Sequence, residues 1–362
     1  MSEWKECKLG DVLTFQRGHD LPRTEMIEGS YPVAGSNGII GFHSKYTTKG
    51  PGITIGRSGN IGTPHFYKND FWAHNTVLYV KDFKGNSEIF LFYFLKTLDF
   101  SQFNTGSAVP SLNRNHIHEL SVEFPHLPEQ RAIASILSSL DDKIDLLHRQ
   151  NATLEKMAET LFRQWFVEEA KEEWETKPLS SIAYFLNGLA CQKYPPKNDL
   201  EKLPVIKIKE LSSGITENSD WATTDVKPEY IVKNGDVIFA WSASLMVKIW
   251  DGQDCILNQH LFKVTSENYP KWFYFLWCKH YLDEFIAKAA SHATTMGHIK
   301  RGDLDDAMVL IPSTKELEEM TFETEPLIAK IISNNRQLRL LVNLRDTLLP
   351  KLMSGEIRVK IN

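Results

Sequence analysis

The side chains best suited to chemistry in this chain are polar residues in short glycine-rich or polar stretches between apolar segments. Arg57, Ser58 and Asn60 lie in the sequence GRSGNIG, where the glycines would let the backbone approach a ligand closely. A guanidinium offers a planar fork of donors and can bind guanine with two hydrogen bonds, whereas asparagine and glutamine match adenine. A surface hairpin that exposes an arginine is the alternative interpretation of the same sequence.

Polar residues of these kinds recur at corresponding points in the two halves of the chain, and they are the candidate contacts to DNA. In the first half they are Arg57, Ser58, Asn60, His74, Asn75, Ser107, Ser111, Asn113 and Arg114. In the second half they are Lys207, Lys209, Ser242, Asn258, Gln259, His260, His292, Thr294, His298, Lys300 and Arg301.

Each group of candidates also has a structural interpretation. Lys207 and Lys209 alternate with isoleucines, which predicts that both lysines leave one face of a strand, either to anchor phosphates or to meet solvent. Asn75 and Asn258 are expected at matching places before a strand. Trp241 replaces the glycine-rich loop in the second half and is more typical of a core.

The familiar catalytic motifs are missing from the sequence. There is no GxxxxGK, GxGxxG, HExxH, GxSxG or Asn-Pro-Pro-aromatic run. The four cysteines are far apart with no CxxC pair, which argues against a disulfide framework or a cysteine zinc site and fits a reducing cytoplasm. We therefore expect no catalytic residue and no metal site in this chain.

The charge of the chain is concentrated in one segment. The formal net charge is −5, and all of it falls within residues 128–176, because the segments on either side are each balanced. A net-acidic chain is unusual for a DNA-binding protein and favours a protein-binding adaptor instead. No apolar run approaches the roughly 20 residues that would span a bilayer.

The sequence contains an internal repeat. Each half opens on a tryptophan, Trp4 or Trp174, and continues through a β-rich region to an aromatic helical stretch. Pro125 and Pro312 then align, and the same offset continues to the C-terminus. These features predict two similar β-rich domains, over residues 1–127 and 174–312.

A heptad pattern follows each predicted domain and indicates two long helices with one shared seam. The seam residues are Ile133, Leu137, Leu140, Ile144, Leu147, Asn151, Leu154 and Leu161 in the first helix, and Leu327, Ile331, Asn334, Leu338, Leu341 and Leu348 in the second. In the second copy Ser313 and Glu316 form a plausible capping box, and Pro326 and Pro350 should start, kink or end the helix.

We predict an α/β (α+β) fold in which two globular β-rich domains are separated by these helices, packed as an antiparallel coiled coil with a pseudo-two-fold repeat. In that arrangement Asn151 and Asn334 become direct neighbours within an apolar seam. The alternative is that each helix packs only on its own domain. Two similar but non-identical domains on a stiff spacer suit duplex DNA, where neighbouring reading sites lie about 34 Å apart.

Several blocks of the sequence resemble the specificity (S) subunits of Type I restriction–modification systems. LPEQRAIASILSSLDDKIDLLHRQNATLEKMAETLFRQWF is similar to the conserved helix of that family, and LLPKLMSGEI to its usual C-terminus. TGSAVPSLNRNHIHELSVEFPHLPEQ and GDVIFAWSASLMVKIWDG resemble parts of its target-recognition domains. The resemblance covers essentially the whole chain, although the chain is short for the family and has Lys315-Glu316-Leu317 where the first copy has Pro128-Glu129-Gln130.

The resemblance implies a division of the chain and a function. Residues 1–127 and 174–312 would be the first and second target-recognition domains, residues 128–173 the central conserved helix, and residues 313–362 the C-terminal conserved helix and tail. The chain would have no catalytic activity of its own and would read a bipartite, asymmetric duplex target, one half-site per domain.

The resemblance also implies partners. Two modification subunits would methylate adenine with S-adenosylmethionine, and restriction subunits would translocate and cut DNA with ATP and magnesium, all in the cytoplasm and without a membrane. The purified chain alone should neither methylate nor cut DNA. The alternatives are a coiled-coil adaptor that binds proteins without sequence-specific DNA recognition, and an enzyme with an unrecognised site such as a metal-dependent nuclease.

Overall fold

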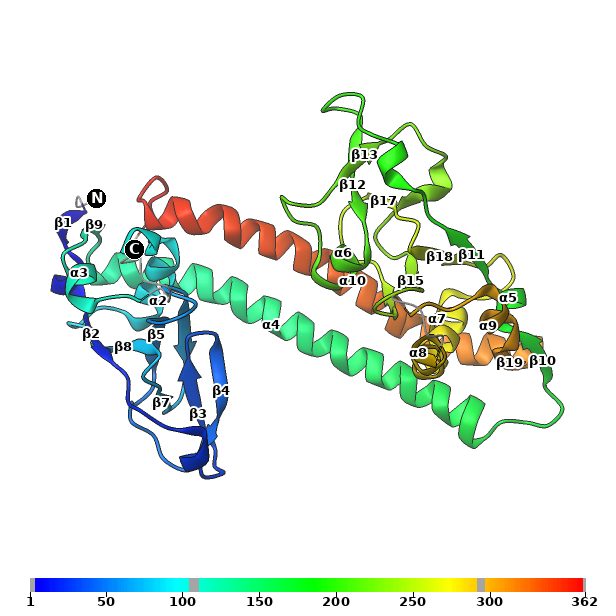
Figure 1. Cartoon of the computed structure of the whole chain (residues 1–362), viewed down its shortest axis with the longest axis horizontal. Helices are drawn as coiled ribbons and strands as arrows, with labels where there is room; N and C mark the ends of the chain where they lie inside the picture. Colours follow the sequence, from blue (N-terminus) through cyan, green and yellow to red (C-terminus); the bar gives the residue numbers. More distant parts are fainter. Residues whose placement is uncertain (1–3, 104–110, 292–296, 361–362) are drawn as a thin grey trace. The chain divides into compact units, whose positions relative to one another are not determined.

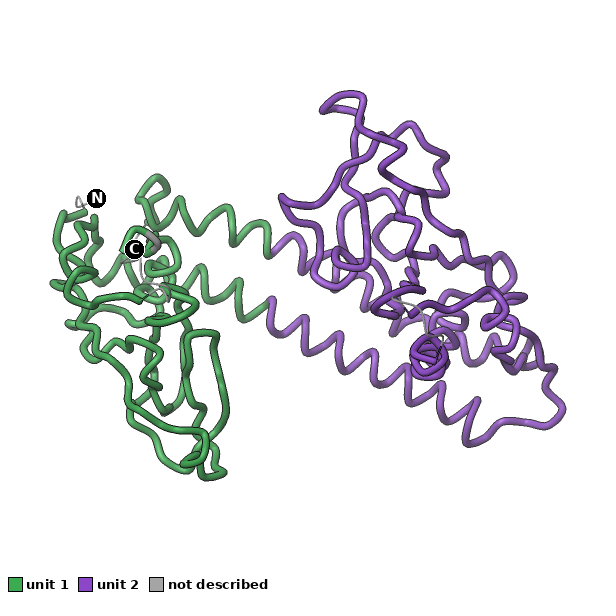
Figure 2. The backbone as a smooth tube through the Cα atoms, in the orientation of Figure 1, with its two compact units in different colours: residues 1–143, 342–362 green, residues 144–341 purple. Residues whose placement is uncertain are grey.

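The computed structural model describes residues 4–103, 111–291 and 297–360 of the 362-residue chain. The chain divides into two compact units, one of residues 1–143 with 342–362 and one of residues 144–341 (Figure 2). The boundary between them crosses both long helices, so each unit contains a β-rich part and a portion of each helix. The described residues include no helix that is both long and apolar enough to cross a membrane.

The first unit builds its β-rich part from three small sheets (Figure 1). Strand β1 pairs with β9, a four-stranded sheet has the order β2-β8-β5-β6, and a three-stranded sheet has the order β4-β3-β7. The elements are β1 (Lys5–Lys8), α1 (Leu9–Val12), β2 (Thr14–Arg17), η1 (Arg23–Glu25), β3 (Tyr31–Gly35), β4 (Gly38–His43), β5 (Gly52–Gly56), β6 (Pro64–Tyr67), β7 (Trp72–Ala73), β8 (Val77–Asp82), α2 (Glu88–Thr97), η2 (Ser101–Phe103), α3 (Arg114–His118) and β9 (Ser121–Phe124).

The core of the first unit lies between the four-stranded sheet and helix α2. Strand β5 is buried along its whole length, and Ile53 and Ile55 are fully covered. Helix α2 begins at a true cap, because the Ser87 hydroxyl accepts a hydrogen bond from the Phe90 backbone N–H. The aromatic face of α2 then packs on β5 and β6, so the aromatic stretch serves as core.

The second unit repeats this plan. Strand β10 pairs with β19, and two four-stranded sheets have the orders β11-β18-β15-β16 and β13-β12-β17-β14. The elements are β10 (Glu175–Pro178), α5 (Leu179–Ile182), β11 (Tyr184–Asn187), η4 (Cys191–Lys193), β12 (Lys202–Ile206), α6 (Ile208–Ser213), β13 (Trp221–Thr223), η5 (Pro228–Tyr230), β14 (Ile231–Val232), β15 (Val237–Ala240), β16 (Met246–Ile249), β17 (Cys255–Leu257), β18 (Leu261–Thr265), α7 (Lys271–His280), α8 (Leu282–Ser291), α9 (Arg301–Asp306) and β19 (Met308–Ile311).

The internal repeat is visible in the backbone pairing. A parallel bridge joins His19 to His74 in the first unit, and the matching bridge joins Leu189 to Asn258 in the second. Asn258 therefore corresponds to His74, and the prediction that it corresponds to Asn75 is wrong by one residue. The error arises because the two turns differ in sequence, while the bridge itself fixes the register.

The prediction that Lys207 and Lys209 leave one face of a strand is also wrong. Strand β12 ends at Ile206, Lys207 is the N-cap of helix α6, and Lys209 lies within that helix. The Glu210 carboxylate accepts a hydrogen bond from the Lys207 backbone N–H at 3.3 Å, which favours a helical first turn over a continued strand. The Lys207 side chain forms an ion pair with Asp220.

The two long helices are α4 (Leu127–Arg163), which continues into a π-helical turn (Gln164–Glu168), and α10 (Thr314–Met353). Helix α10 runs through both Pro326 and Pro350, so the expectation that these prolines start or end the helix is wrong.

Within each unit the portions of α4 and α10 run antiparallel. In the second unit Asn151 contacts Asn334, whereas residues later in α4 share a core with Met320 and Ile328, which lie earlier in α10. In the first unit Asp141 pairs with Arg345 at 2.9 Å, and the more N-terminal Ile133 shares a core with Leu352. None of the fourteen seam residues is exposed.

The Asn151–Asn334 contact expected from the heptad register is present. Asn334, which is fully buried, donates a hydrogen bond from Nδ2 to Oδ1 of Asn151 at 2.9 Å. The bond is not returned, because Asn151 donates to Oδ1 of Asn335 at 2.6 Å. Oδ1 of Asn334 has no partner among the described residues.

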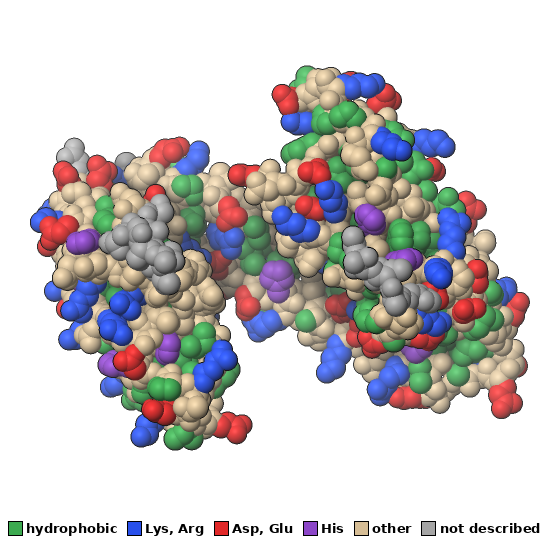
Figure 3. Space-filling model, viewed as in Figure 1, with side chains coloured by type: hydrophobic (Ala, Val, Ile, Leu, Met, Phe, Trp, Pro, Cys, Tyr) green, Lys and Arg blue, Asp and Glu red, His purple; other side chains and the backbone are tan. Residues whose placement is uncertain are grey.

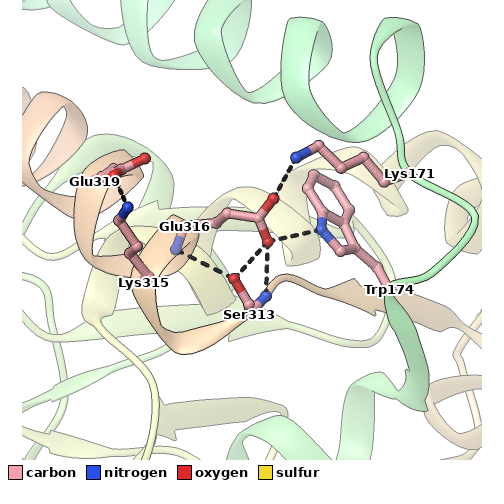
Figure 4. A network of polar contacts seen from close by, with 6 residues as sticks. All are labelled: Lys171, Trp174, Ser313, Lys315, Glu316 and Glu319. Atoms are coloured by element: carbon pink, nitrogen blue, oxygen red, sulfur yellow. Dashed lines mark hydrogen bonds and ion pairs between the residues drawn. The ribbon is translucent and has the colours of Figure 1, made fainter.

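A tryptophan, a glutamate and a cation meet at the start of each long helix. In the first unit Glu129, 2% exposed, accepts hydrogen bonds from Trp4 Nε1 at 3.3 Å and from Arg358 at 2.5 and 2.7 Å. In the second unit Glu316 binds Trp174 Nε1 at 3.0 Å and forms an ion pair with Lys171 (Figure 4). We call these two sets the glutamate clamps.

The second clamp also caps the N-terminus of helix α10. The Glu316 carboxylate accepts a hydrogen bond from the Ser313 backbone N–H at 3.0 Å, and the Ser313 hydroxyl accepts one from the Glu316 N–H at 3.4 Å (Figure 4). This is the capping box expected from the sequence. Hydrogen bonds from Lys171 and from Ser313 lower the pKa of Glu316 to about 2.

We predict that Glu316→Gln destabilises the second unit by about 1 kcal/mol at neutral pH, the size of a lost helix cap. The pKa of Glu316 is lowered to about 2 on folding, so its stabilisation is present above the unfolded pKa of about 4.3 and is lost as the pH falls toward 2. Urea unfolding of the variant and the parent should therefore converge between pH 5 and pH 2.5.

The matched control is Glu319→Gln, one turn further along α10, where the carboxylate pairs with Lys315 at 3.9 Å and both side chains are exposed (Figure 4). Exposed pairs of this kind contribute only a few tenths of a kcal/mol. A pH-independent effect of Glu316→Gln, or an equal effect of both variants, would contradict the role given to the clamp.

Candidate nucleic-acid interface

Three arginines surround one hollow on the first unit. The described residues leave a hollow of about 450 Å³, lined by Arg17, Arg57, Leu78, Ser111, Leu112, Asn113 and Arg114. Basic side chains are grouped on part of the face of this unit that Figure 3 shows. Four of the predicted residues, Arg57, Ser111, Asn113 and Arg114, come together here, and Arg17 joins them without having been predicted.

Close backbone packing places these side chains. Arg57 follows β5, and its N–H donates to the Thr76 carbonyl at 2.8 Å while its own carbonyl accepts from the Leu112 N–H at 2.9 Å. Arg17 ends β2 beside Gly18, where a Cβ atom would lie 2.1 Å from the His74 carbonyl oxygen. Only glycine fits there, so the end of β2 and the turn before β8 approach directly.

One carboxylate serves this cationic cluster. The Arg57 guanidinium donates to the Asn75 carbonyl at 3.3 Å, the Asn75 amide donates to Asp20, and Asp20 pairs with Arg17 at 3.7 Å. Burial lowers the pKa of Arg57 and the nearby Arg17 lowers it further, whereas Asp20 opposes both effects. Arginine nevertheless stays charged at neutral pH, so the hollow favours an acceptor-rich or anionic ligand.

The other first-half candidates have local partners. The Asn60 side chain accepts a hydrogen bond from Thr63 Oγ1 at 3.2 Å, and His74 Nδ1 lies 3.0 Å from Thr76 Oγ1. Asn113 caps α3, because its Oδ1 accepts from the Asn115 N–H at 3.0 Å. Ser58 pairs with Ser111 through an isolated antiparallel β-bridge. Ser107 lies outside the described residues.

The second unit uses the same backbone frame with different side chains. The Trp241 N–H donates to the His260 carbonyl at 3.4 Å and the Trp241 carbonyl accepts from the Ile299 N–H at 3.1 Å, so Trp241 occupies the place of Arg57. Its indole N–H donates to Asn187 Oδ1 at 3.3 Å, and Asn187 occupies the place of Arg17. Trp241 is half-buried and stacks on Phe262, with ring centroids 5.6 Å apart.

Imidazole and hydroxyl groups surround this tryptophan. The rings of His260 and His298 have centroids 6.0 and 6.3 Å from that of Trp241. Ser242 Oγ lies 3.2 Å from His260 Nδ1, and Gln259 Nε2 lies 3.3 Å from His260 Nε2. The second unit thus offers an aromatic, imidazole-rich surface where the first offers arginines.

The remaining second-half candidates are spread around this frame. Asn258 is buried, and its Oδ1 accepts from the His260 N–H at 3.3 Å, which makes it a structural residue of the turn. Arg301 begins α9 as Arg114 begins α3, and Lys300 is the N-cap of α9. Lys209 is exposed on α6. His292 and Thr294 lie outside the described residues.

Known proteins resemble this chain in sequence and in fold. A family model for the Type I restriction modification DNA specificity domain matches residues 1–156 and 171–341. The specificity subunit of the Type I restriction enzyme MjaIX from Methanocaldococcus jannaschii is 29% identical over 303 residues, which are 75% of this chain and 69% of the relative. The MjaVIII specificity subunit from the same organism is 22% identical over 406 residues, covering 99% and 94% of the two chains.

A solved structure agrees. The S subunit of a Type I restriction–modification system from M. genitalium superimposes with a TM-score of 0.67 over 96% of each chain at 15% identity, which shows that the fold is shared. Because the family model matches both halves of the repeat, the chain belongs to the specificity subunits of Type I restriction–modification systems and carries two DNA specificity domains.

Proposed function

We propose that this chain is the non-catalytic specificity subunit of a Type I restriction–modification complex, reading one half-site of a bipartite duplex target with each domain. The observation that carries the proposal is the arginine-lined hollow of the first unit, where Arg17, Arg57 and Arg114 converge. Guanidinium groups on a rigid backbone frame are the side chains that bind guanine edges and phosphates most often.

The differences between the two domains support an asymmetric target. The frame that holds Arg57 in the first unit holds Trp241 in the second. A guanidinium favours guanine, whereas the second surface offers Gln259, His260 and Ser242, which suit other base edges. Two identical half-sites would therefore not suit the two domains equally well.

Modification and restriction subunits are the proposed partners. Helix α4 leaves Ile136, Leu146 and Met157 at least one-third exposed, and we take these apolar side chains as candidate contacts for a partner subunit. We propose that S-adenosylmethionine, ATP and magnesium act on those partners, with two methyltransferase subunits per chain. Their chemistry would be adenine methylation, followed by ATP-driven translocation and cleavage.

A protein-binding adaptor remains a second candidate, because the net charge of −5 does not favour contact with phosphates. The two proposals differ in their response to salt. A DNA-reading chain should lose affinity for duplex DNA steeply as salt rises, with a slope set by the number of neutralised phosphates. An adaptor would show neither specific binding nor that slope.

The direct test of the proposed function is to map methylated adenines in DNA exposed to the chain reconstituted with its modification subunits. We expect a single motif with two defined half-sites and an unspecified spacer. Methylation without sequence preference, or methyl transfer by the chain alone, would refute the proposal.

Arg57→Ala and Arg114→Ala should each weaken specific binding more than Lys45→Ala, which removes an exposed cation between β4 and β5. A bidentate base contact contributes about 1–3 kcal/mol to discrimination, whereas an isolated phosphate contact mainly changes the salt slope. Titrations of the mapped target at two salt concentrations would measure both effects. Equal losses for all three variants would remove the case for base reading by Arg57 and Arg114.

A further inference from the structure

Asp20 occupies a position where a DNA-binding surface would not be expected to keep a carboxylate. It is exposed, with 74% of its side chain accessible, and it lies among the arginines of the first unit. A phosphate backbone on this face would repel it. Exposed ion pairs contribute little to folding, so stability does not account for its place.

The contacts of Asp20 connect it to two of the three arginines. It pairs directly with Arg17 at 3.7 Å. It also accepts a hydrogen bond from the Asn75 side chain, and the Asn75 carbonyl accepts from Arg57 Nη1 at 3.3 Å. One carboxylate therefore contacts one guanidinium directly and is connected to a second through Asn75.

We propose that Asp20 is a positioning residue for sequence discrimination in the first half-site, fixing Arg17 and, through Asn75, Arg57. This inference rests on the proposed function, because it concerns how the same hollow distinguishes one base from another. A long arginine side chain free to rotate can meet a phosphate in many directions, whereas reading a base edge requires one direction.

Among the described residues, this set of contacts around Asp20 belongs to the first domain alone. The bridges of His19 to His74 and of Leu189 to Asn258 align Asp20 with Ala190. In the second unit the corresponding side chains, Asn187 and Trp241, are oriented by their own hydrogen bond at 3.3 Å. Loss of Asp20 should therefore leave discrimination in the second half-site unchanged.

Removal of Asp20 should have opposite effects on specific and non-specific binding. Taking a negative charge off the face reduces repulsion of phosphates, so affinity for unrelated duplexes should hold or rise. Releasing the two guanidiniums should lower affinity for the correct sequence. A purely electrostatic role would raise both affinities, and a purely structural role would lower both.

The experiment uses the full chain in complex with its modification subunits. The probes are the duplex defined by methylation mapping and a duplex of equal length with the first half-site scrambled. Asp20→Asn should reduce the ratio of the two affinities about tenfold, the size of one bidentate base contact, without lowering affinity for the scrambled duplex. Glu6→Gln, which removes the same charge from exposed strand β1, should change neither the ratio of the two affinities nor the methylated motif.

A double-mutant cycle separates positioning from direct contact. If Asp20 acts through Arg17 and Arg57, Asp20→Asn should cause no further loss of discrimination in a chain that carries Arg17→Ala and Arg57→Ala. An undiminished loss in that background would mean that Asp20 itself contacts a base, and it would overturn the inference. The inference would also be overturned if Asp20→Asn alone changed the affinities for the two duplexes in parallel, or changed neither. A parent complex that does not discriminate between the duplexes would instead refute the proposed function.

Discussion

A buried or half-buried carboxylate at the first turn of each long helix ties together segments that are distant in the sequence, three at Glu129 and two at Glu316. A carboxylate such as Glu129 is stable in a site with 2% exposure only when hydrogen-bond donors and a cation surround it. Trp4, at the start of the domain, and Arg358, just after α10, supply them. Because β1 pairs with β9, the strand that leads into α4, this clamp fixes the domain against the helix within its unit.

The residue that follows each clamp glutamate also anchors its unit, by polar contacts in the first unit and by apolar packing in the second. Gln130, beside the clamp, is also buried, and it binds Asn86, Pro125 and the Ser87 N–H at 2.8 to 3.0 Å, which anchors the start of α2. The second unit has Leu317 at the matching position and packs it against its apolar core instead. The replacement of Gln130 by Leu317 in the second copy is therefore a change from a polar to an apolar anchor.

The heptads made the long helices and the Asn151–Asn334 contact predictable, because a strict repeat and a constant offset determine which layers face each other. The glutamate clamps could not be predicted. Lys171 and Arg358 look like solvated charges in the sequence, and only the folded chain brings them to Glu316 and Glu129. The misplacement of Lys207 has the opposite cause, since local capping by Glu210 overrides an alternating pattern of two isoleucines.

The interface residues that lie in polar stretches of the sequence could be predicted, whereas those at or just after the end of a short strand could not. Arg57 and Arg114 stand out in glycine-rich or polar sequence, whereas Arg17 and Asp20 belong to no motif and join the cluster only because Gly18 lets β2 approach the turn at His74. In the second unit Trp241 was expected in the core, yet it is half-buried in the frame that holds Arg57 in the first. The types of the two side chains do not reveal that Trp241 and Arg57 are equivalent, because only the backbone hydrogen bonds show it.

The central claim is that two structurally equivalent but chemically different domains each read half of one target. The most direct measurement replaces residues 175–311, from β10 through β19, with the matching segment of a relative that has a different target, and maps methylated adenines with the reconstituted complex. The account predicts a motif in which one half-site changes to that of the donor and the other is retained. A motif in which both half-sites change, in a chimera that unfolds as cooperatively as the parent, would contradict it.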